Sequence, residues 1–155
     1  MENMIIRAAT IEDIQQLRKF EQGVITAERP FDNTLNADPI QYYDLEQQIQ
    51  NENIYLAVAE LKGQLIACGY ARIEKAKPYV SYNFYSYLGF MYVMPEHRGK
   101  GLNQQIIDSL TCWSKDQGIT MMHLDVFAEN SSALRAYQKA GFKANLVEMR
   151  LDIST

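Results

Sequence analysis

Apolar residues recur along the chain with two periods, which predict alternating strands and helices. Short apolar runs rich in β-branched and aromatic residues, bounded by turn residues, are typical of strands. Apolar positions three and four residues apart are typical of amphipathic helices. The expected strands are 4–9, 54–59, 65–73, 84–93 and 121–127, with a terminal strand or hairpin half over 142–153.

Four helices are expected from the longer spacing. The first follows Thr10, a good N-cap with Asp13 at the fourth position of a capping box, and ends near residue 22 because Gly23 weakens it. A loop over 25–38 follows, since Pro30 breaks helices. The other helices are 40–50 after Pro39, a long one from Leu102 to Gly118, and a short one capped by Asn130 or Ser131 and closed by Gly141.

The resulting order of elements is β-α-α-β-β-β-α-β-α-β. Its first half predicts an antiparallel meander, while the strand–helix–strand unit over 84–127 requires a right-handed crossover between parallel strands. A chain of 155 residues is long enough for one sizeable core and short for two. We therefore expect a single α/β (α+β) domain, 1–155, with a mixed sheet and helices on both faces.

The turn between the strand 84–93 and the next helix is rich in glycine and positive charge. Pro95 ends the strand, because proline cannot donate a hydrogen bond to a sheet. Gly99 and Gly101 let the backbone bend and approach a ligand closely. The first amides of the helix point outward with partial positive charge, and Arg98 and Lys100 add mobile charge at the rim. This arrangement predicts a cradle for a phosphate or pyrophosphate.

Single residues exclude two well-known phosphate-binding loops. A Walker A loop requires Ser or Thr after its lysine, where this chain has Gly101, and a dinucleotide fingerprint requires a third glycine, where it has Gln104. The pattern R-x-x-G-x-G/A fits through Arg98, Gly101 and Asn103, with Val-x-Pro just before it. This resembles the coenzyme A loop of the GNAT superfamily of acyl-CoA N-acyltransferases. Asn103 departs from that family, which usually has Gly or Ala there.

A second segment strengthens the resemblance. The apolar run 124–126 is followed by Asn130, Ala133, Tyr137 and the pair Gly141-Phe142. This is similar to the family pattern of an apolar strand, then N-x-x-A-x-x-x-Y, then G-F. Two motifs in the correct order, separated by one helix and one strand, are more specific than either motif alone.

The resemblance implies a mostly antiparallel sheet of six to seven strands that splays between its fourth and fifth strands, with Gly89 aiding a bulge. Pantetheine would pair with freed backbone in the split, and its pyrophosphate would meet the amides of Gly99–Gln104. Asn130 would bind the pantetheine arm. The expected coenzyme-binding residues are Met91, Tyr92, Val93, Arg98, Gly99, Lys100, Gly101, Leu102, Asn103, Gln104, Asn130 and Tyr137.

The resemblance also implies an acetyl-CoA-dependent N-acetyltransferase, with acetyl-CoA as cosubstrate and no metal. A primary amine would attack the thioester carbonyl directly, and a backbone amide near Val93 would stabilise the oxyanion. The Tyr137 hydroxyl would protonate the leaving thiolate as general acid. Spacing alone favours a core aromatic at Tyr137, whereas its combination with Asn130 favours the catalytic role.

The general base is left open. An alkyl ammonium must lose a proton before it attacks, but the strand that carries a carboxylate in some family members has Tyr85 and Tyr87 here. Glu28 and Asp32, in the loop that often covers the acceptor, and Asp125 are candidates; solvated or structural acids explain them equally well, and a water relay needs none of them. Tyr85 and Tyr87 form either a pocket wall for a cation or ordinary sheet packing.

Net charge, hydropathy and cysteine spacing limit the classes of partner, compartment and metal site that the chain is expected to have. A formal net charge of −4 disfavours general nucleic-acid binding and suits a cationic partner. The chain has no apolar run of the ~20 residues that span a bilayer, so no membrane association is expected. Cys68 and Cys112 lie in apolar patterns without C-x-x-C spacing, which predicts reduced thiols and a cytoplasmic protein. The two histidines lack ligand-like spacing, so no metal site is expected. Terminal strands often pair between subunits in this fold, which would give a homodimer.

Two other functions compete with the enzyme. The missing strand carboxylate and Asn103 suit a non-catalytic acyl-CoA sensor or interaction module on the same fold. A nucleic-acid binder that uses the basic turn is disfavoured by the net charge and by the small size of that turn. The sequence leaves the acceptor amine open.

Overall fold

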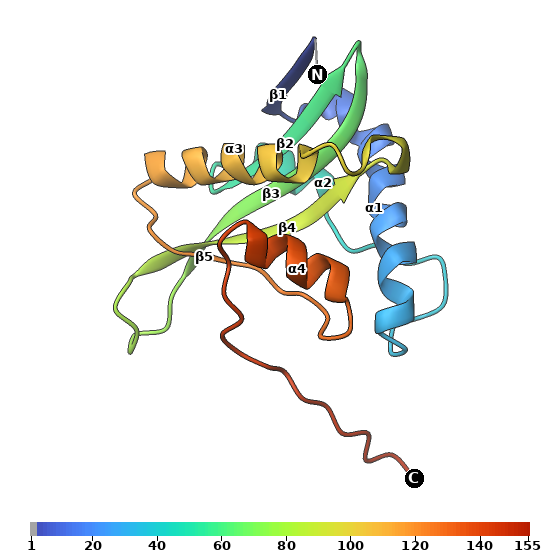
Figure 1. The fold of residues 1–155 in the computed structure, drawn as a ribbon, viewed down its shortest axis with the longest axis vertical. Helices are drawn as coiled ribbons and strands as arrows, with labels where there is room; N and C mark the ends of the chain where they lie inside the picture. Colours follow the sequence, from blue (N-terminus) through green and yellow to red (C-terminus); the bar gives the residue numbers. More distant parts are fainter. Residues whose placement is uncertain (1–2) are drawn as a thin grey trace. The chain divides into compact units, whose positions relative to one another are not determined.

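A computed structural model describes residues 3–155, which form two compact units. The first unit ends at Asp125 and holds a sheet with helices on both faces, while the second, Val126–Thr155, holds one helix and an extended C-terminal segment. Figure 1 follows the chain through both units.

The first unit is built on a five-stranded sheet in the order β1-β2-β3-β4-β5. Its antiparallel part comprises β1 (Met4–Ala8), β2 (Ile54–Leu61), β3 (Gln64–Lys75) and β4 (Phe84–Val93). β5 (Met122–His123) pairs parallel to β4. The mixed, mostly antiparallel sheet is confirmed, but the expected count of six to seven strands is wrong. The strand expected over 121–127 is also shorter, because its pairing with β4 is limited to two residues.

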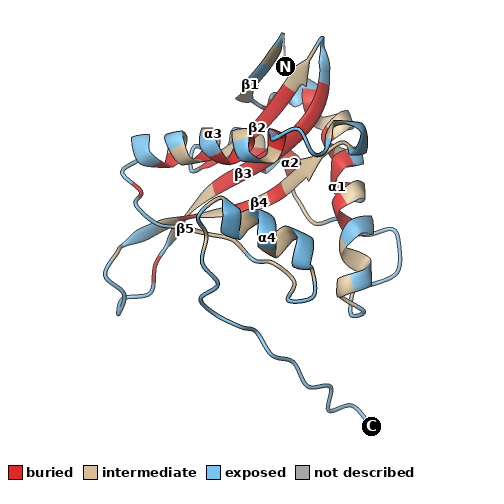
Figure 2. Ribbon diagram, in the orientation of Figure 1, coloured by how far each residue is buried: buried red, intermediate tan, exposed pale blue. Residues whose placement is uncertain are grey.

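The two faces of the sheet carry side chains of different size. On the face toward α3 (Leu102–Asp116), strand alternation places small residues beside Gly69, namely Ala57, Ala59, Ala67 and Ala71. A Cβ on Gly69 would lie 2.8 Å from Cγ2 of Ile106 on this helix. The opposite face carries larger residues, including Leu56, Val58, Cys68 and Tyr70, which form the main core with α1 (Ile14–Glu28) and α2 (Leu45–Gln50). Figure 2 shows buried residues along β2, β3 and β4 and on α1 and α3.

The first helix is longer than expected. The Asp13 carboxylate accepts the Thr10 N–H at 2.8 Å, as the capping box predicts, and a 3-10 turn (Ile11–Asp13) leads into α1 (Ile14–Glu28). The predicted end at Gly23 is wrong. An interior glycine costs about 1 kcal/mol relative to alanine, whereas burying Val24 and Ile25 beyond it contributes about 2 kcal/mol each. Burial therefore extends the helix through residues that were expected to form a loop.

The second helix is shorter than expected. α2 spans Leu45–Gln50 only, and Asp44 caps it by accepting the Gln47 N–H at 3.1 Å. Residues 40–44 are not helical. The amides of Tyr42 and Tyr43 instead donate to the buried Glu21 carboxylate of α1. Hydrogen bonds to the Glu21 side chain thus take the place of the helical first turn that was expected over 40–44.

The second unit contains α4 (Ser131–Lys139), capped by Asn130 and followed by Gly141 at φ +107°. The expected terminal strand over 142–153 is absent from the described residues. A strand needs a partner backbone, and the described residues of the second unit form no other strand. The segment leaves five apolar side chains more than 70% exposed, those of Leu146, Val147, Met149, Leu151 and Ile153.

Candidate functional site

The turn between β4 and α3 has the geometry of an anion cradle. A 3-10 turn (Pro95–His97) follows β4, and Gly99 and Gly101 adopt the left-handed conformation at φ +77° and +79°. A Cβ built on either glycine meets nothing within 4 Å, so the space in front of both is open. α3 begins at Leu102 with Gly101 as its N-cap and no side chain capping it. The first amides of a 15-residue helix therefore face this open space.

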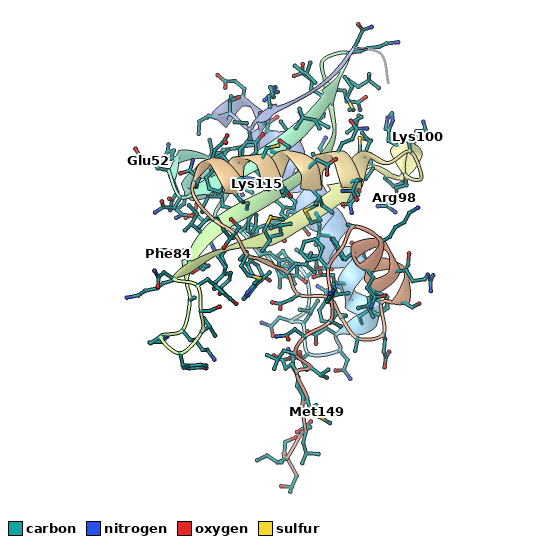
Figure 3. The ribbon with its side chains drawn as sticks, turned by 60° about the vertical axis from the view of Figure 1, so that its left-hand side comes forward. Glu52, Phe84, Arg98, Lys100, Lys115 and Met149 are labelled. Atoms are coloured by element: carbon teal, nitrogen blue, oxygen red, sulfur yellow. The ribbon has the colours of Figure 1, made fainter. Side chains whose placement is uncertain are left out.

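The two basic residues of the turn differ in their placement. Arg98 donates from Nε to the Val93 carbonyl at 2.8 Å, and its guanidinium lies 5.5 Å from the Tyr92 ring centroid. Lys100 is exposed at the tip of the turn. Figure 3 shows both side chains beside the N-terminal end of α3, with Lys115 toward its other end. Arg98 thus braces the strand end, whereas Lys100 supplies mobile positive charge.

A β-bulge interrupts β4 just before the cradle. Cys68 pairs with Tyr92 but Tyr70 pairs with Gly89, so β4 contains one extra residue relative to β3. Phe90 takes the left-handed conformation at φ +54°, which is rare outside glycine. The bulge was expected, but the residue in the unusual conformation is Phe90 and not Gly89. Gly89 instead makes room for Tyr70, whose ring atoms would lie 2.5 Å from a Cβ there.

The sheet splits beyond Tyr87. β4 pairs with β5 through Ser86 and Tyr87 only, although β4 continues to Val93. The Met94 N–H donates to the Ile66 carbonyl at 2.9 Å, which makes Ala67 and Val93 a non-hydrogen-bonded pair. The N–H and C=O of Val93 therefore point away from β3, toward the side that β5 has left. This confirms the expected splay between the fourth and fifth strands.

Tyr87, a predicted wall residue of the acceptor pocket, is in direct contact with Asp125, a candidate base in the same predicted pocket. The Tyr87 hydroxyl donates to Oδ2 of Asp125 at 2.8 Å. Burial and this hydrogen bond hold the pKa of Tyr87 well above its ordinary value, so the phenol stays protonated. The guanidinium of Arg72 lies 5.1 Å from the Tyr87 ring centroid, and it pairs with Glu74 on its own strand. A role for Arg72 beside Tyr87 was not predicted. Alternation along β3 shows on which face of the sheet Arg72 lies, but not which residue of β4 lies next to it.

Glu28 and Asp32 lie at the C-terminal end of α1, next to the Tyr42 side chain. Burial raises the pKa of Glu28 above its ordinary value, the negative charge of Asp32 raises it further, and a hydrogen bond with Tyr42 acts in the opposite direction. Asp32 accepts the backbone N–H of Thr34 at 2.9 Å. The structure thus brings these two acids together, and Tyr42 is a neighbour that the sequence pattern assigned to a helix.

Tyr85 is engaged with a histidine that sequence reasoning considered only as a metal ligand. Its ring stacks on His123 with centroids 3.9 Å apart, and His123 Nε2 lies 2.9 Å from the Tyr82 hydroxyl. The parallel pairing of β4 with β5 creates this contact. The aromatic run around residue 85 indicated that Tyr85 packs against other side chains. The register between β4 and β5, which places His123 beside it, exists only in the folded sheet.

The second motif lies in the second unit. Asn130 Oδ1 caps α4 by accepting the Ala133 N–H at 3.2 Å, which leaves its side-chain NH₂ group as a donor. Tyr137 is half-buried on α4, and its ring meets Phe142 edge-on with centroids 5.9 Å apart. These contacts account for the Asn, Tyr and Phe positions of the motif within this unit.

Residues 3–155 contain no group of three or more His, Cys, Asp or Glu side chains placed to hold a metal ion. Over the same residues, every helix is too short or too polar to cross a bilayer.

One protein-family model matches most of the chain. Residues 15–142 match the model of the Acetyltransferase (GNAT) family. A stretch of 58 residues is 45% identical to the uncharacterized N-acetyltransferase YobR of Bacillus subtilis (strain 168). That stretch covers 37% of this chain and 24% of the Bacillus protein, so it spans about a quarter of that relative.

Solved structures show the same fold at low sequence identity. A tetramutant protein from Bacillus halodurans matches with a TM-score of 0.87 and 19% identity, over 96% of this chain and 99% of that one. A predicted acetyltransferase of Clostridium acetobutylicum, solved with acetyl-CoA, gives 0.76 and 20% over 97% and 96%. An aminoglycoside N-acetyltransferase in complex with CoA gives 0.73 and 18% over 96% and 99%.

Proposed function

This chain belongs to the acetyltransferase (GNAT) family, and we propose that it transfers an acetyl group from acetyl-CoA to a primary amine. The observation that carries the proposal is the open cradle at the start of α3, beside a strand whose outer backbone edge is released from β5. Exposed helix amides suit the pyrophosphate. A strand edge without a neighbouring strand suits the amide-rich pantetheine arm, although its Val93 carbonyl already accepts a hydrogen bond from Arg98 Nε. We propose that both units act together as one domain.

The coenzyme residues have separate roles in this proposal. The backbone of Met91, Tyr92 and Val93 pairs with pantetheine, and the Asn130 side-chain amide donates to the same arm. The pyrophosphate is bound by the turn and the first helical amides, at Arg98, Gly99, Lys100, Gly101, Leu102, Asn103 and Gln104. Asn103 is half-buried, so its side chain adds a polar wall where the family usually has Gly or Ala.

The chemical step uses two groups of this chain. The backbone N–H of Val93 stabilises the oxyanion that forms when the amine nitrogen bonds to the thioester carbon, an effect worth about 3 kcal/mol per donor. As the carbon–sulfur bond breaks, Tyr137 donates its hydroxyl proton to the thiolate. The ammonium loses one proton to a base or to water before the attack. The second proton leaves the nitrogen of the tetrahedral intermediate for the Tyr137 oxygen, directly or through water, which restores the phenol and balances charge and protons.

The acceptor binds on the side of the sheet that carries Glu28, Asp32, Tyr85, Tyr87 and Asp125. Glu28 is the base that we favour, because a carboxylate with a raised pKa holds a proton more readily than an ordinary one. Because the Tyr87 hydroxyl donates its hydrogen to Asp125, the lone pairs of the Tyr87 oxygen can accept a hydrogen bond from another donor, such as an ammonium group. Acidic and aromatic groups together favour a cationic amine.

The test is to incubate the protein with acetyl-CoA and a panel of amines, and to follow the release of free thiol. The panel includes a polyamine, an amino acid, an aminoglycoside-type amine and a peptide N-terminus. We expect saturable release with at least one acceptor. Saturable binding of acetyl-CoA without release for any amine supports a non-catalytic sensor instead, and absence of binding at millimolar coenzyme contradicts both functions.

A further inference from the structure

A buried carboxylate on α1 fastens the segment that precedes α2. Glu21 is 1% exposed, and its Oε2 accepts the backbone N–H of Tyr42 at 2.9 Å and that of Tyr43 at 2.7 Å. The neighbouring Gln22 donates from Nε2 to the Ile40 carbonyl at 3.0 Å. Burying a carboxylate is costly unless hydrogen bonds satisfy it. Segment 40–44 is therefore held to α1 through its backbone, which leaves its tyrosine side chains for other contacts.

One of these side chains packs on the bulge of β4. The Tyr43 ring stacks on Phe90 with centroids 4.5 Å apart and an angle of 28° between the rings. It also meets the Tyr70 ring edge-on at 6.0 Å. On the backbone of Phe90, the Cys68 thiol donates to the carbonyl at 3.3 Å. The side chain and the backbone of the bulge residue are thus each held by a contact from another element.

Phe90 needs such support. A left-handed conformation in a non-glycine residue costs about 1–2 kcal/mol and persists only where the surrounding structure holds it. Phe90 lies three residues beyond Tyr87, where β4 and β5 stop pairing. The extra residue changes which side chains of β4 face each side of the sheet, and it precedes Met91, Tyr92 and Val93 directly. The bulge therefore sets the orientation of this backbone.

We propose that Glu21 and Tyr43 are positioning residues for the split in the sheet. Glu21 fixes the backbone at Tyr43, the Tyr43 ring holds Phe90 in the bulge, and the bulge orients the outer edge of Met91–Val93. The same anchor fixes Tyr42, which contacts the acceptor-side Glu28. The two substrate sites of the proposed acetyl transfer therefore share one support, and this consequence rests on the proposed function.

The structural part is tested without any ligand, by hydrogen exchange of the β4 amides followed by mass spectrometry. In Tyr43→Leu, which removes the ring, we expect the amides of 88–93 to exchange about tenfold faster while those of 84–87 do not change. Tyr43→Phe keeps the stack and serves as the matched control with unchanged exchange. Equal rates in Tyr43→Leu and the unaltered protein, or a uniform increase along β4, overturn the proposal.

The same measurement separates the anchor from the ring. Glu21→Gln keeps an oxygen that accepts the two N–H groups, whereas Glu21→Leu keeps only the approximate volume. We expect Glu21→Leu to reproduce the local increase of Tyr43→Leu and Glu21→Gln to show a smaller one. An equal global increase in both Glu21 variants contradicts an anchoring role specific to the bulge.

The functional part is tested by calorimetric titration with CoA. We expect Tyr43→Leu to weaken binding about tenfold, or ~1.4 kcal/mol. Phe90→Gly removes the same ring stack, and glycine adopts the bulge conformation without strain. The double variant that combines Tyr43→Leu with Phe90→Gly should therefore lose no more CoA affinity than Tyr43→Leu alone. Leu65→Ala, a buried change in the same core, controls for lost stability and should leave CoA affinity unaltered. Additive losses of CoA affinity from Tyr43→Leu and Phe90→Gly overturn the coupling between these two residues. If the unaltered protein does not bind CoA, the proposed function fails, and the hydrogen-exchange result still decides the structural role.

Discussion

At the scale of single residues, Gly23 has a role that depends on a residue far away in the chain. It lies within α1, and the tip of the Tyr92 side chain of β4 occupies the space where a Cβ would stand. Tyr92 in turn packs on Phe20 with ring centroids 4.9 Å apart and lies under Arg98. The missing side chain therefore allows α1 to approach the strand that leads into the cradle.

Gly23→Ala tests this role. In an open helix the change stabilises by about 1 kcal/mol, but here the new methyl would lie 2.7–2.8 Å from Tyr92 ring atoms. We expect a loss of about 1 kcal/mol in the free energy of unfolding, measured by urea denaturation. In a Tyr92→Ala background, the same Gly23→Ala change should become stabilising. A stabilising effect in both backgrounds shows that the contact does not limit this position.

Glu28 carries a prediction about pH. A general base acts only when deprotonated, so activity falls as pH drops through its pKa, which here lies above the ordinary value. Glu28→Gln should abolish that acid limb of kcat/KM for the amine and lower the plateau about 100-fold. Asp32→Asn should keep the limb but move it to lower pH, because the Asp32 charge raises the pKa of Glu28. An unchanged profile in Glu28→Gln removes Glu28 from the reaction and leaves Asp125 or water as the base.

At the scale of elements, α3 joins the core to the cradle. Its buried side chains, including Ile106 and Leu110, pack on the small-residue face of the sheet, while its first turn opens onto the two left-handed glycines. The β2–β3 hairpin contains a glycine of the same kind, Gly63 at φ +80° with nothing within 4 Å of its Cβ position. The chain thus offers a matched pair of glycines, only one of which borders the cradle.

Gly101→Ala and Gly63→Ala should lower stability alike and differ in coenzyme binding. Each forces a Cβ into the left-handed region, at a cost of about 1 kcal/mol in unfolding free energy. Only Gly101→Ala disturbs the start of α3, and we expect its Kd for CoA to rise about tenfold, whereas Gly63→Ala should leave it within twofold. Thermal melts and calorimetric titration measure the two effects. Equal Kd values in both variants contradict a cradle at this turn.

The elements were predictable to the extent that their signals are local. The strands around 54–61 and 84–93 and the helix after Leu102 follow from runs of adjacent residues, so their periods identified them. The end of α1 did not follow, since burial of Val24 and Ile25 outweighs the cost of Gly23. The non-helical 40–44 segment did not follow either, because Glu21 binds its amides from another element.

At the largest scale, the proposed acetyl transfer draws its residues from both units. The cradle and the split of the sheet belong to the first unit, whereas Asn130 and Tyr137 belong to the second. The proposed function assigns the oxyanion to Val93 of the first unit and the leaving thiolate to Tyr137 of the second.

Tyr137→Phe separates binding from chemistry at this scale. The ring and its edge-on contact with Phe142 are kept, and only the hydroxyl is removed. We expect thioester turnover to fall about 100-fold, while the calorimetric Kd for CoA stays within twofold. A Phe142→Leu variant, which alters the ring contact but keeps the hydroxyl, serves as control. Turnover unchanged in Tyr137→Phe excludes this hydroxyl as the acid.

Local sequence was sufficient to predict the order of the strands and helices as far as α4, the glycine-rich turn and the two family motifs. These features depend on residues that are neighbours in the chain, where conformational preference and periodicity act directly. Four features follow from the folded chain alone: Phe90 carries the bulge, Tyr87 contacts Asp125, Tyr92 fills the space where a Gly23 Cβ would stand, and Glu21 accepts the Tyr43 amide. Each of these depends on which distant side chains the packed sheet brings into contact, and no local pattern encodes that choice.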